Sequence, residues 1–189
     1  MSLYVLVKDN QIKKYPYTQT DLRRDNTNVS FPAGVLPDEV VASWGMFPVL
    51  ITQPSSYDIQ KQKAVQGTPE LADNKWRQTW SLVEMTQPEI EQTKASIKDS
   101  ISRAVQKRLD DFAKSRGYDD IKSACDYAGC DVVKYSTEGA YCKNQRARTW
   151  EVLYGIFDQA DSGIRRLPDN YDAVEPELPA LAWPTTGDV

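Results

Sequence analysis

Paired carboxylates are the side chains of this chain whose type and spacing come closest to catalytic chemistry. Asp110 is followed directly by Asp111, and Asp119 is followed directly by Asp120. Glycosidases hold two carboxyl groups about 5–9.5 Å apart across the substrate, so that one donates a proton while the other attacks or activates water. Adjacent residues on a helix point in different directions, so neither pair forms such a site. We interpret both pairs as surface charges and helix caps, and we expect no catalytic residues and no enzymatic activity.

Histidine is missing from all 189 residues of the chain, which removes the commonest general base near neutral pH and the usual nitrogen ligand of zinc. The three cysteines, Cys125, Cys130 and Cys142, lack the paired C-x-x-C spacing of zinc sites. We expect them to be reduced, partly buried thiols of a protein made in a cytoplasm. The glycine-rich motifs that bind nucleotide phosphates are missing as well, so the sequence predicts neither a metal nor a cofactor.

Charge and hydropathy limit the classes of partner. The formal net charge is −4, which gives the whole chain no attraction to nucleic acid or to anionic lipid. Lys143, Arg146 and Arg148 form a small basic cluster, but Glu138 and Glu151 dilute it, and a solvated helix face is the simpler interpretation. No apolar run approaches the ~20 residues that span a bilayer, and the N-terminus does not resemble a secretory signal. We expect neither a nucleic-acid partner nor a membrane partner.

Residues 1–85 are expected to form a small N-terminal β module with an antiparallel sheet and many loops. Asp9-Asn10 and Asp73-Asn74 are each predicted to occupy a tight turn between two strands, because both residue types tolerate positive φ. Partly alternating apolar and polar residues indicate strands with one packed face and one solvent-exposed face.

Other signals in this module are less regular. The segment 18–28 is predicted to be rich in turns. A short helix is predicted from Pro37 to Ser43, where proline and acidic residues favour a first helical turn. The apolar strand that follows contains Pro48, which should keep it at a sheet edge or at a bulge, because proline cannot donate a backbone hydrogen bond.

The hydrophobic period changes at Thr86, where Pro88 predicts the first turn of a helix. From Ile90 to Phe112, apolar residues recur at steps of three, four and seven, which indicates one buried stripe on a helix of about seven turns. Gly117 is expected to end this helix.

Two further helices are expected after it. Asp119 is predicted to cap a short helix over 120–128, and a third helix is predicted to begin at Ser136 or Thr137. The apolar face of the third helix is expected to contain Ala147, Trp150, Leu153, Tyr154, Phe157 and Ala160. Brief connections favour an antiparallel helical hairpin domain over 86–163, so the chain is predicted to be an α+β protein.

Residues 164–189 are expected to form an extended, apolar, proline-rich tail. Exposing Leu178, Leu181 and Trp183 would cost free energy and promote association. The tail can pack on the helices of its own chain or in a groove on a neighbouring subunit. For the second alternative, Leu178, Leu181 and Trp183 are the candidate partner-binding residues, and deletion of 176–189 should weaken assembly more than it unfolds the monomer.

Several stretches of the sequence are distinctive in combination. Those of the N-terminal half are Tyr15-Pro16-Tyr17, the block LRRDNTNVSFP at 22–32, Trp44-Gly45, Pro48-Val49, and 76–83 running into Met85-Thr86. Those of the helical half are 108–111, 116–119, 123–125 and 178–184. Together they resemble tailed-bacteriophage proteins encoded near tail-fibre genes, and the helical half is similar to a phage-associated domain of unknown function.

The resemblance covers nearly the whole chain and implies a phage protein that is made in the bacterial host cytoplasm. We expect a non-enzymatic structural protein of the virion tail, associated with the fibre, the baseplate or the neck. Its expected partners are other tail proteins, which it contacts in several copies within a symmetric assembly. The resemblance transfers no catalytic, cofactor-binding or metal-binding residues. The alternative is a tail-fibre assembly chaperone that is absent from the mature virion.

Overall fold

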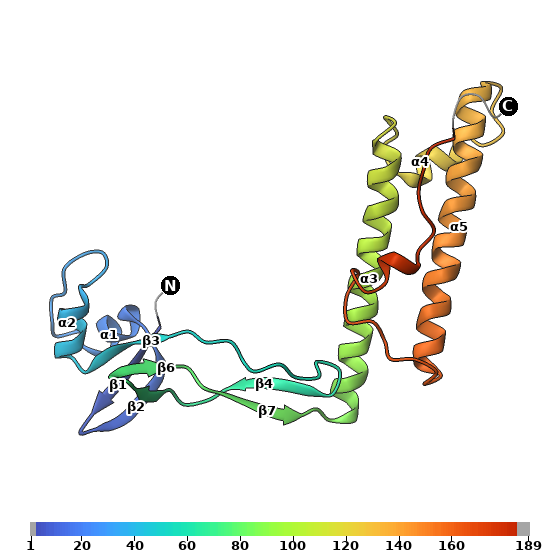
Figure 1. Ribbon diagram of the computed structural model, residues 1–189. Coiled ribbons are helices and arrows are strands. Elements are labelled where there is room, and N and C mark those ends of the chain that lie inside the picture. Colours follow the sequence, from blue (N-terminus) through green and yellow to red (C-terminus); the bar gives the residue numbers. More distant parts are fainter. Residues whose placement is uncertain (1–2, 185–189) are drawn as a thin grey trace. The chain divides into compact units, whose positions relative to one another are not determined.

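Residues 3–184 of the chain are described by a computed structural model, which shows a mixed α+β protein with a sheet near the N-terminus and long helices after it (Figure 1). The chain divides into two units between Met85 and Thr86. Each unit has its own cluster of buried apolar side chains.

The N-terminal unit contains seven strands and two short helices within the described residues. The strands are β1 (Tyr4–Lys8), β2 (Gln11–Tyr17), β3 (Met46–Leu50), β4 (Gln62–Gln66), β5 (Glu70–Ala72), β6 (Lys75–Arg77) and β7 (Trp80–Glu84). The helices are α1 (Gln19–Asp25) and α2 (Asp38–Ser43). Five strands form one sheet in the order β2-β1-β3-β6-β5, and β4 pairs with β7 in a separate two-stranded ribbon.

Both predicted turns are confirmed. Asp9 and Asn10 connect β1 to β2, and Asp73 and Asn74 connect β5 to β6, with positive φ at all of these residues. Two successive left-handed residues give the turn whose twist matches that of the flanking strands. The predicted helix after Pro37 is also present, as α2.

The sheet departs from the predicted antiparallel arrangement at β3. This strand lies between β1 and β6 instead of at an edge, and it pairs with β6 in parallel. Pro48 is tolerated because pairing with β6 begins only at Val49, whose own amide donates to the Leu3 carbonyl at 2.9 Å on the β1 side. Successive amides along a strand point to opposite sides, so the nitrogen of Pro48 falls where no donor is required. The predicted edge position is therefore wrong.

Most of the segment 18–28, predicted to be rich in turns, forms the helix α1, and only residues 26–28 are turns. The hydroxyl of Thr18 accepts from the amide of Asp21 at 3.1 Å, and the Asp21 carboxylate accepts from the amide of Thr18 at 3.0 Å. This reciprocal capping satisfies two donors that a helix start leaves free. The hydroxyl of Thr18 also donates to Asp21 and lowers the pKa of that carboxyl. Leu22 anchors the helix in the core, where it meets Tyr4, Tyr17, Leu36, Val41 and Met46.

The helices of the C-terminal unit are α3 (Gln87–Lys114), α4 (Ile121–Asp126) and α5 (Val133–Asp161). The long helices α3 and α5 run side by side in opposite directions, and the chain after α5 returns along them (Figure 1). We call this returning chain the C-terminal segment (164–184); it includes the short helix η1 (Glu175–Glu177). The core is formed by Ile101, Val105, Leu109, Ala113, Ile121, Ala124, Cys142, Leu153, Ile156, Phe157, Leu167, Val174 and Leu178.

Some details of these helices differ from the prediction. Asp120, not Asp119, caps α4. The helix α5 begins at Val133 without a side-chain cap, so no local signal marks its start. Leu153 and Phe157 of the predicted apolar face are buried, but Ala147 and Tyr154 are exposed, and Ile156 lies in the core in their place.

Candidate interaction surfaces

The candidate partner-binding residues Leu178, Leu181 and Trp183 lie against the helices of their own chain. Leu178 is buried, and the other two are partly buried against the same core. This is the first of the two alternatives that the sequence left open. The role of these residues in binding another protein stays a prediction.

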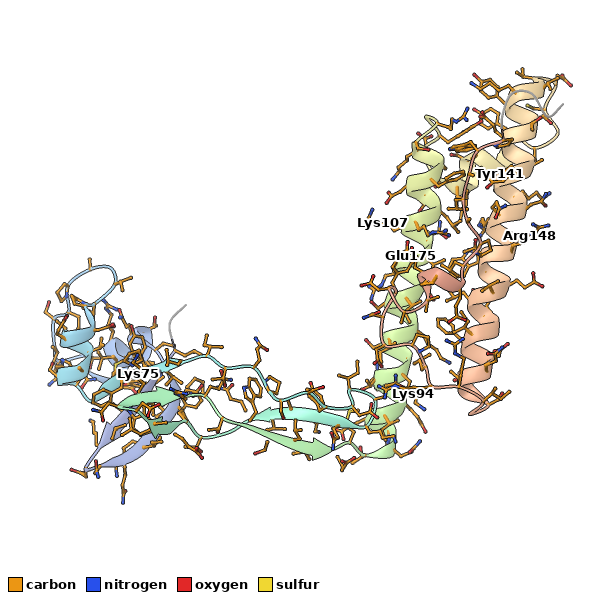
Figure 2. The ribbon with its side chains drawn as sticks, viewed as in Figure 1. Lys75, Lys94, Lys107, Tyr141, Arg148 and Glu175 are labelled. Atoms are coloured by element: carbon orange, nitrogen blue, oxygen red, sulfur yellow. The ribbon has the colours of Figure 1, made fainter. Side chains whose placement is uncertain are left out.

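Hydrogen bonds between backbone and side chains fix the C-terminal segment in place. Arg108 of α3 donates to the carbonyl of Pro179 at 2.9 Å. The Tyr141 hydroxyl of α5 accepts from the amide of Ala182 at 2.9 Å, and Tyr141 lies among the side chains between the helices and this segment (Figure 2). The segment is therefore held from both long helices.

Trp183 is the centre of an aromatic cluster. Its ring stacks on Phe112, with ring centroids 4.2 Å apart and an interplanar angle of 13°. The Arg116 guanidinium lies 5.2 Å from the Trp183 centroid, in the geometry of a cation–π contact. The indole N–H donates to the Ser115 hydroxyl at 3.0 Å. The cluster is completed by two further rings, those of Tyr118 and Tyr141.

Glu138 is a buried acidic residue next to this cluster, and the predicted solvated helix face around it is wrong at this position. Its carboxylate accepts from the Tyr118 hydroxyl at 2.7 Å and from Arg116 at 3.1 Å, and its side chain is 7% exposed. Burial and the hydrogen bond to Glu138 raise the pKa of Tyr118, which keeps this phenol protonated. Arg116 and Tyr118 flank Gly117, just after the end of α3. Their hydrogen bonds to Glu138 therefore hold the end of α3 against α5.

The paired carboxylates act at the ends and on the surface of helices. Asp110 accepts from the amide of Ile121 at 3.1 Å, at the start of α4. Asp120 accepts from the amide of Ser123 at 2.7 Å, and this hydrogen bond lowers the pKa of Asp120. Asp111 forms an ion pair on the surface of α3. These contacts agree with the interpretation of the pairs as caps and surface charges.

The basic residues of α5 do not gather on one face. Lys143 and Arg148 are exposed, whereas Arg146 is partly buried, and Arg148 lies on the side of α5 away from α3 (Figure 2). Residues two positions apart on a helix point in nearly opposite directions, so Arg146 and Arg148 do not form one basic face.

The three thiols form no disulfide with one another. Cys142 is buried and Cys125 is partly buried. Burial raises the pKa of Cys142 to about 12 and also raises the pKa of Cys125. Within residues 3–184, no group of three or more His, Cys, Asp or Glu side chains is arranged to hold a metal ion.

These thiols are expected to differ in reactivity toward iodoacetamide. Alkylation requires the thiolate, which burial disfavours at Cys142. At about pH 8 we expect Cys130 to be alkylated in the native protein, and Cys142 to be alkylated at least about tenfold more slowly until a denaturant is added. Peptide mass spectrometry at timed intervals measures both rates. Equal native rates at Cys130 and Cys142 would contradict the buried position of Cys142.

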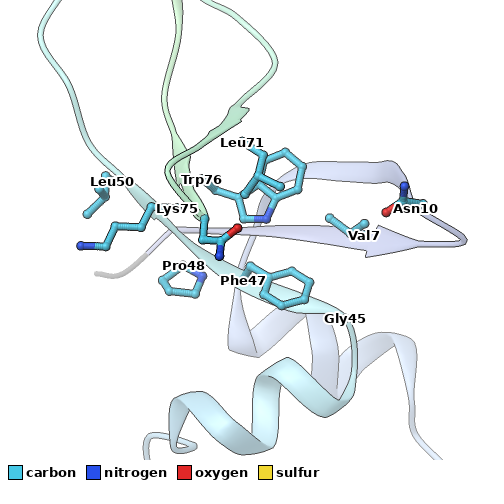
Figure 3. A pocket seen from close by; sticks show the side chains of 10 residues that line it. Val7, Asn10, Gly45, Phe47, Pro48, Leu50, Leu71, Lys75 and Trp76 are labelled. Atoms are coloured by element: carbon cyan, nitrogen blue, oxygen red, sulfur yellow. The ribbon is translucent and has the colours of Figure 1, made fainter.

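An apolar hollow lies on the five-stranded sheet of the N-terminal unit (Figure 3). Its volume is about 620 Å³, and the apolar part of its lining comes mainly from Phe47, Pro48, Leu50, Leu71 and Trp76. Leu50 and Leu71 are 47% and 57% exposed. Exposed apolar side chains grouped in this way are typical of a contact surface for another molecule.

Comparisons with protein-family models, with curated proteins and with solved structures found no match for this chain. None of the helices within residues 3–184 has the length and apolar character needed to cross a membrane.

Proposed function

We propose that this chain is a non-enzymatic structural protein of a bacteriophage tail, associated with the fibre, the baseplate or the neck. In this proposal it is located in the virion, is present in several copies within a symmetric assembly, and acts through protein–protein contacts. The sequence resemblance described above is the basis of the proposal.

The observation that carries the proposal is a set of contacts within the helical unit. Two of the resembling blocks, 108–111 and 116–119, both contact a third, 178–184. Arg108, in the block 108–111, contacts the backbone of the block 178–184. Arg116, in the block 116–119, lies over the ring of Trp183 in that same block. These three blocks, which are distant in sequence, contact one another in the fold. Such contacts support the hypothesis that the blocks resemble the phage proteins because the fold is shared.

The finer architecture belongs to the same proposal. We take the N-terminal β module and the antiparallel helical hairpin as two separate contact modules. The extended, proline-rich tail completes the hairpin as a third layer across α3 and α5. Exposed apolar residues of the β module, in the hollow around Phe47 and Trp76, then remain available for contact with other tail proteins.

The chemistry of the described side chains supports a role through surfaces. Asp110 and Asp120 are engaged at the start of α4, and the raised pKa of Cys142 keeps its thiol protonated. The backbone hydrogen bond from Ser123 lowers the pKa of Asp120 and stabilises its charged form, which is a poor general acid.

Mass spectrometry of purified particles tests the proposal. We expect peptides of this chain in mature virions of the phage that encodes it, at a constant number of copies per particle. Absence from particles, together with recovery of the chain on immature tail fibre, would overturn the proposal in favour of an assembly chaperone. Turnover of a glycan, peptide or nucleotide by the purified full chain would overturn the non-enzymatic assignment.

A further inference from the structure

The apolar hollow on the five-stranded sheet has the size and the lining of a ligand site. Its volume of about 620 Å³ lies within the range of ~300–1,000 Å³ that is typical of ligand pockets. Phe47 and Trp76 lie across its middle (Figure 3). Asn10 lies at one end, and Leu50 and Lys75 lie at the other. A ligand that fills the hollow therefore meets two aromatic rings in its centre and polar groups at its ends.

The aromatic rings of the hollow are carried by strands that the sheet holds in place. Phe47 of β3 pairs with Val5 of β1, and Val5 is buried. Trp76 of β6 pairs with Val49 of β3, and Val49 is buried as well. Large rings on a fixed backbone lose little conformational freedom when a partner binds, so they are effective anchors of an interface. The hollow is thus formed before any partner arrives.

The polar side chains of the hollow are available to a ligand. Asn10, Asn74 and Lys75 line it, and none of their side chains has a hydrogen-bond or ion-pair partner within residues 3–184. Among the described residues that line the hollow, Lys75 is the one with a charge. The carboxylate of Asp73, two positions before Lys75, is instead paired with Arg77 at 3.0 Å.

This set of groups favours an apolar ligand that carries a negative charge. The lysine ammonium group can only donate hydrogen bonds, and the two asparagine amides can donate as well as accept. With a lysine and no acidic side chain in the lining, a carboxylate on the ligand is complementary in charge, whereas a basic group is not. A peptide combines the required features, because it presents an apolar side chain to the rings, a carbonyl to an amide and a carboxylate to the lysine.

We propose that the hollow binds a segment of another protein in which a large apolar side chain stands next to an aspartate or a glutamate. The apolar side chain packs on Phe47 and Trp76, and the carboxylate pairs with Lys75. The inference deepens the proposed function, because it gives the chemistry of the partner segment, and it rests on that function only in requiring that the chain act through protein–protein contacts.

Two blocked peptides test this site by NMR titration of the full chain. The probes are acetyl-Gly-Leu-Phe-Asp-Gly-amide and the same peptide with asparagine in place of aspartate. We expect the aspartate peptide to shift the Trp76 indole signal and to bind with a Kd of about 1 mM or lower. It should bind about threefold more tightly than the asparagine peptide at low salt, because an exposed ion pair contributes modestly. At about 1 M salt this preference should vanish, as it should in Lys75→Gln.

Matched substitutions locate the peptide. Leu71→Glu places a carboxylate in the hollow at a 57% exposed leucine, and Val65→Glu places one at a 44% exposed valine of β4 outside it. We expect Leu71→Glu to weaken binding of the aspartate peptide at least about tenfold by repulsion. Val65→Glu should leave the Kd within about twofold of the unchanged chain. Circular dichroism verifies that both variants are folded.

Several results would contradict the inference. They are the lack of saturable binding of the aspartate peptide up to about 5 mM, equal affinities of the two peptides at low salt, and equal effects of Leu71→Glu and Val65→Glu. Self-association of the full chain that is lost only in Leu71→Glu would assign the hollow to a second copy and overturn the proposed occupant. Presence in virions without peptide binding overturns this inference alone, and peptide binding combined with absence from virions overturns only the tail location.

Discussion

Gly139→Ala is expected to destabilise the helical unit, whereas Gly155→Ala on the same helix is expected to stabilise it. A Cβ atom at Gly139 would lie 2.5 Å from the nitrogen of Ala128 and 2.9 Å from the carbonyl oxygen of Ala124, both of them backbone atoms. Neither can move without displacing α4 from α5. Forcing extra atoms into a packed site costs about 1–3 kcal/mol, and we expect a loss near about 2 kcal/mol, net of the helix preference of alanine.

Gly155 is the matched control because, apart from its own chain neighbours and the adjoining helix backbone, no atom lies within 4 Å of the position its Cβ would take. Alanine in a helix interior is favoured over glycine by about 0.5–1 kcal/mol. Chemical denaturation followed by far-UV circular dichroism, which the long helices dominate, gives both changes in the free energy of unfolding. Stabilisation by Gly139→Ala, as expected for Gly155→Ala, would show that α4 and α5 do not approach as closely as described.

These glycines also show what the sequence could not predict. Gly139 and Gly155 are both isolated glycines within helical patterns, and no neighbouring residue in the sequence indicates a special role for either. Whether a glycine is required depends on which backbone lies opposite, and here that backbone is the turn that follows α4. Glu138 was missed for the same reason, because its partners Arg116 and Tyr118 come from the end of another helix.

Features that depend on residues close together in the sequence were predicted more successfully. The turns at Asp9 and Asp73, the start of α2 and the change of period at Thr86 depend on residues that are neighbours in sequence, and those features are present. The position of β3 inside the sheet was predicted wrongly, because it depends on where pairing with β6 begins relative to Pro48. The start of α1 was missed because Thr-x-x-Asp is a weaker capping signal than Thr-x-x-Glu.

The candidate site was predicted in part. Leu178, Leu181 and Trp183 were selected because an apolar tail must pack somewhere, and they do pack. The sequence could not decide between the chain's own helices and a neighbour. The side chains that contact Trp183 lie far from it along the chain, on α3, just after its end and on α5. They form no sequence pattern that indicates contact with a tryptophan.

Trp183→Ala is expected to lower the free energy of unfolding of the helical unit by about 2–3 kcal/mol. Truncation of a tryptophan in a core costs about 3–5 kcal/mol, and the value is reduced here because Trp183 is only partly buried. Trp183→Phe should retain the stacking on Phe112 but lose the hydrogen bond to Ser115, at a cost of about 1 kcal/mol. Tyr154→Ala is the control, because this ring is 55% exposed and its loss should cost less than about 1 kcal/mol.

The C-terminal segment can stabilise its own hairpin or bind a neighbouring subunit. Thermal and denaturant unfolding measure the stability of these variants, and sedimentation velocity measures their association, so the two methods together distinguish these roles. If the segment serves mainly its own hairpin, Trp183→Ala lowers stability and leaves association unchanged under conditions where the variant is folded. If Trp183 binds a neighbour instead, association falls while stability stays within about 0.5 kcal/mol of the unchanged chain. The stacking on Phe112 and the hydrogen bonds from Arg108 and to Tyr141 favour the first outcome, because a segment held at several points by its own helices has few groups left to offer another chain.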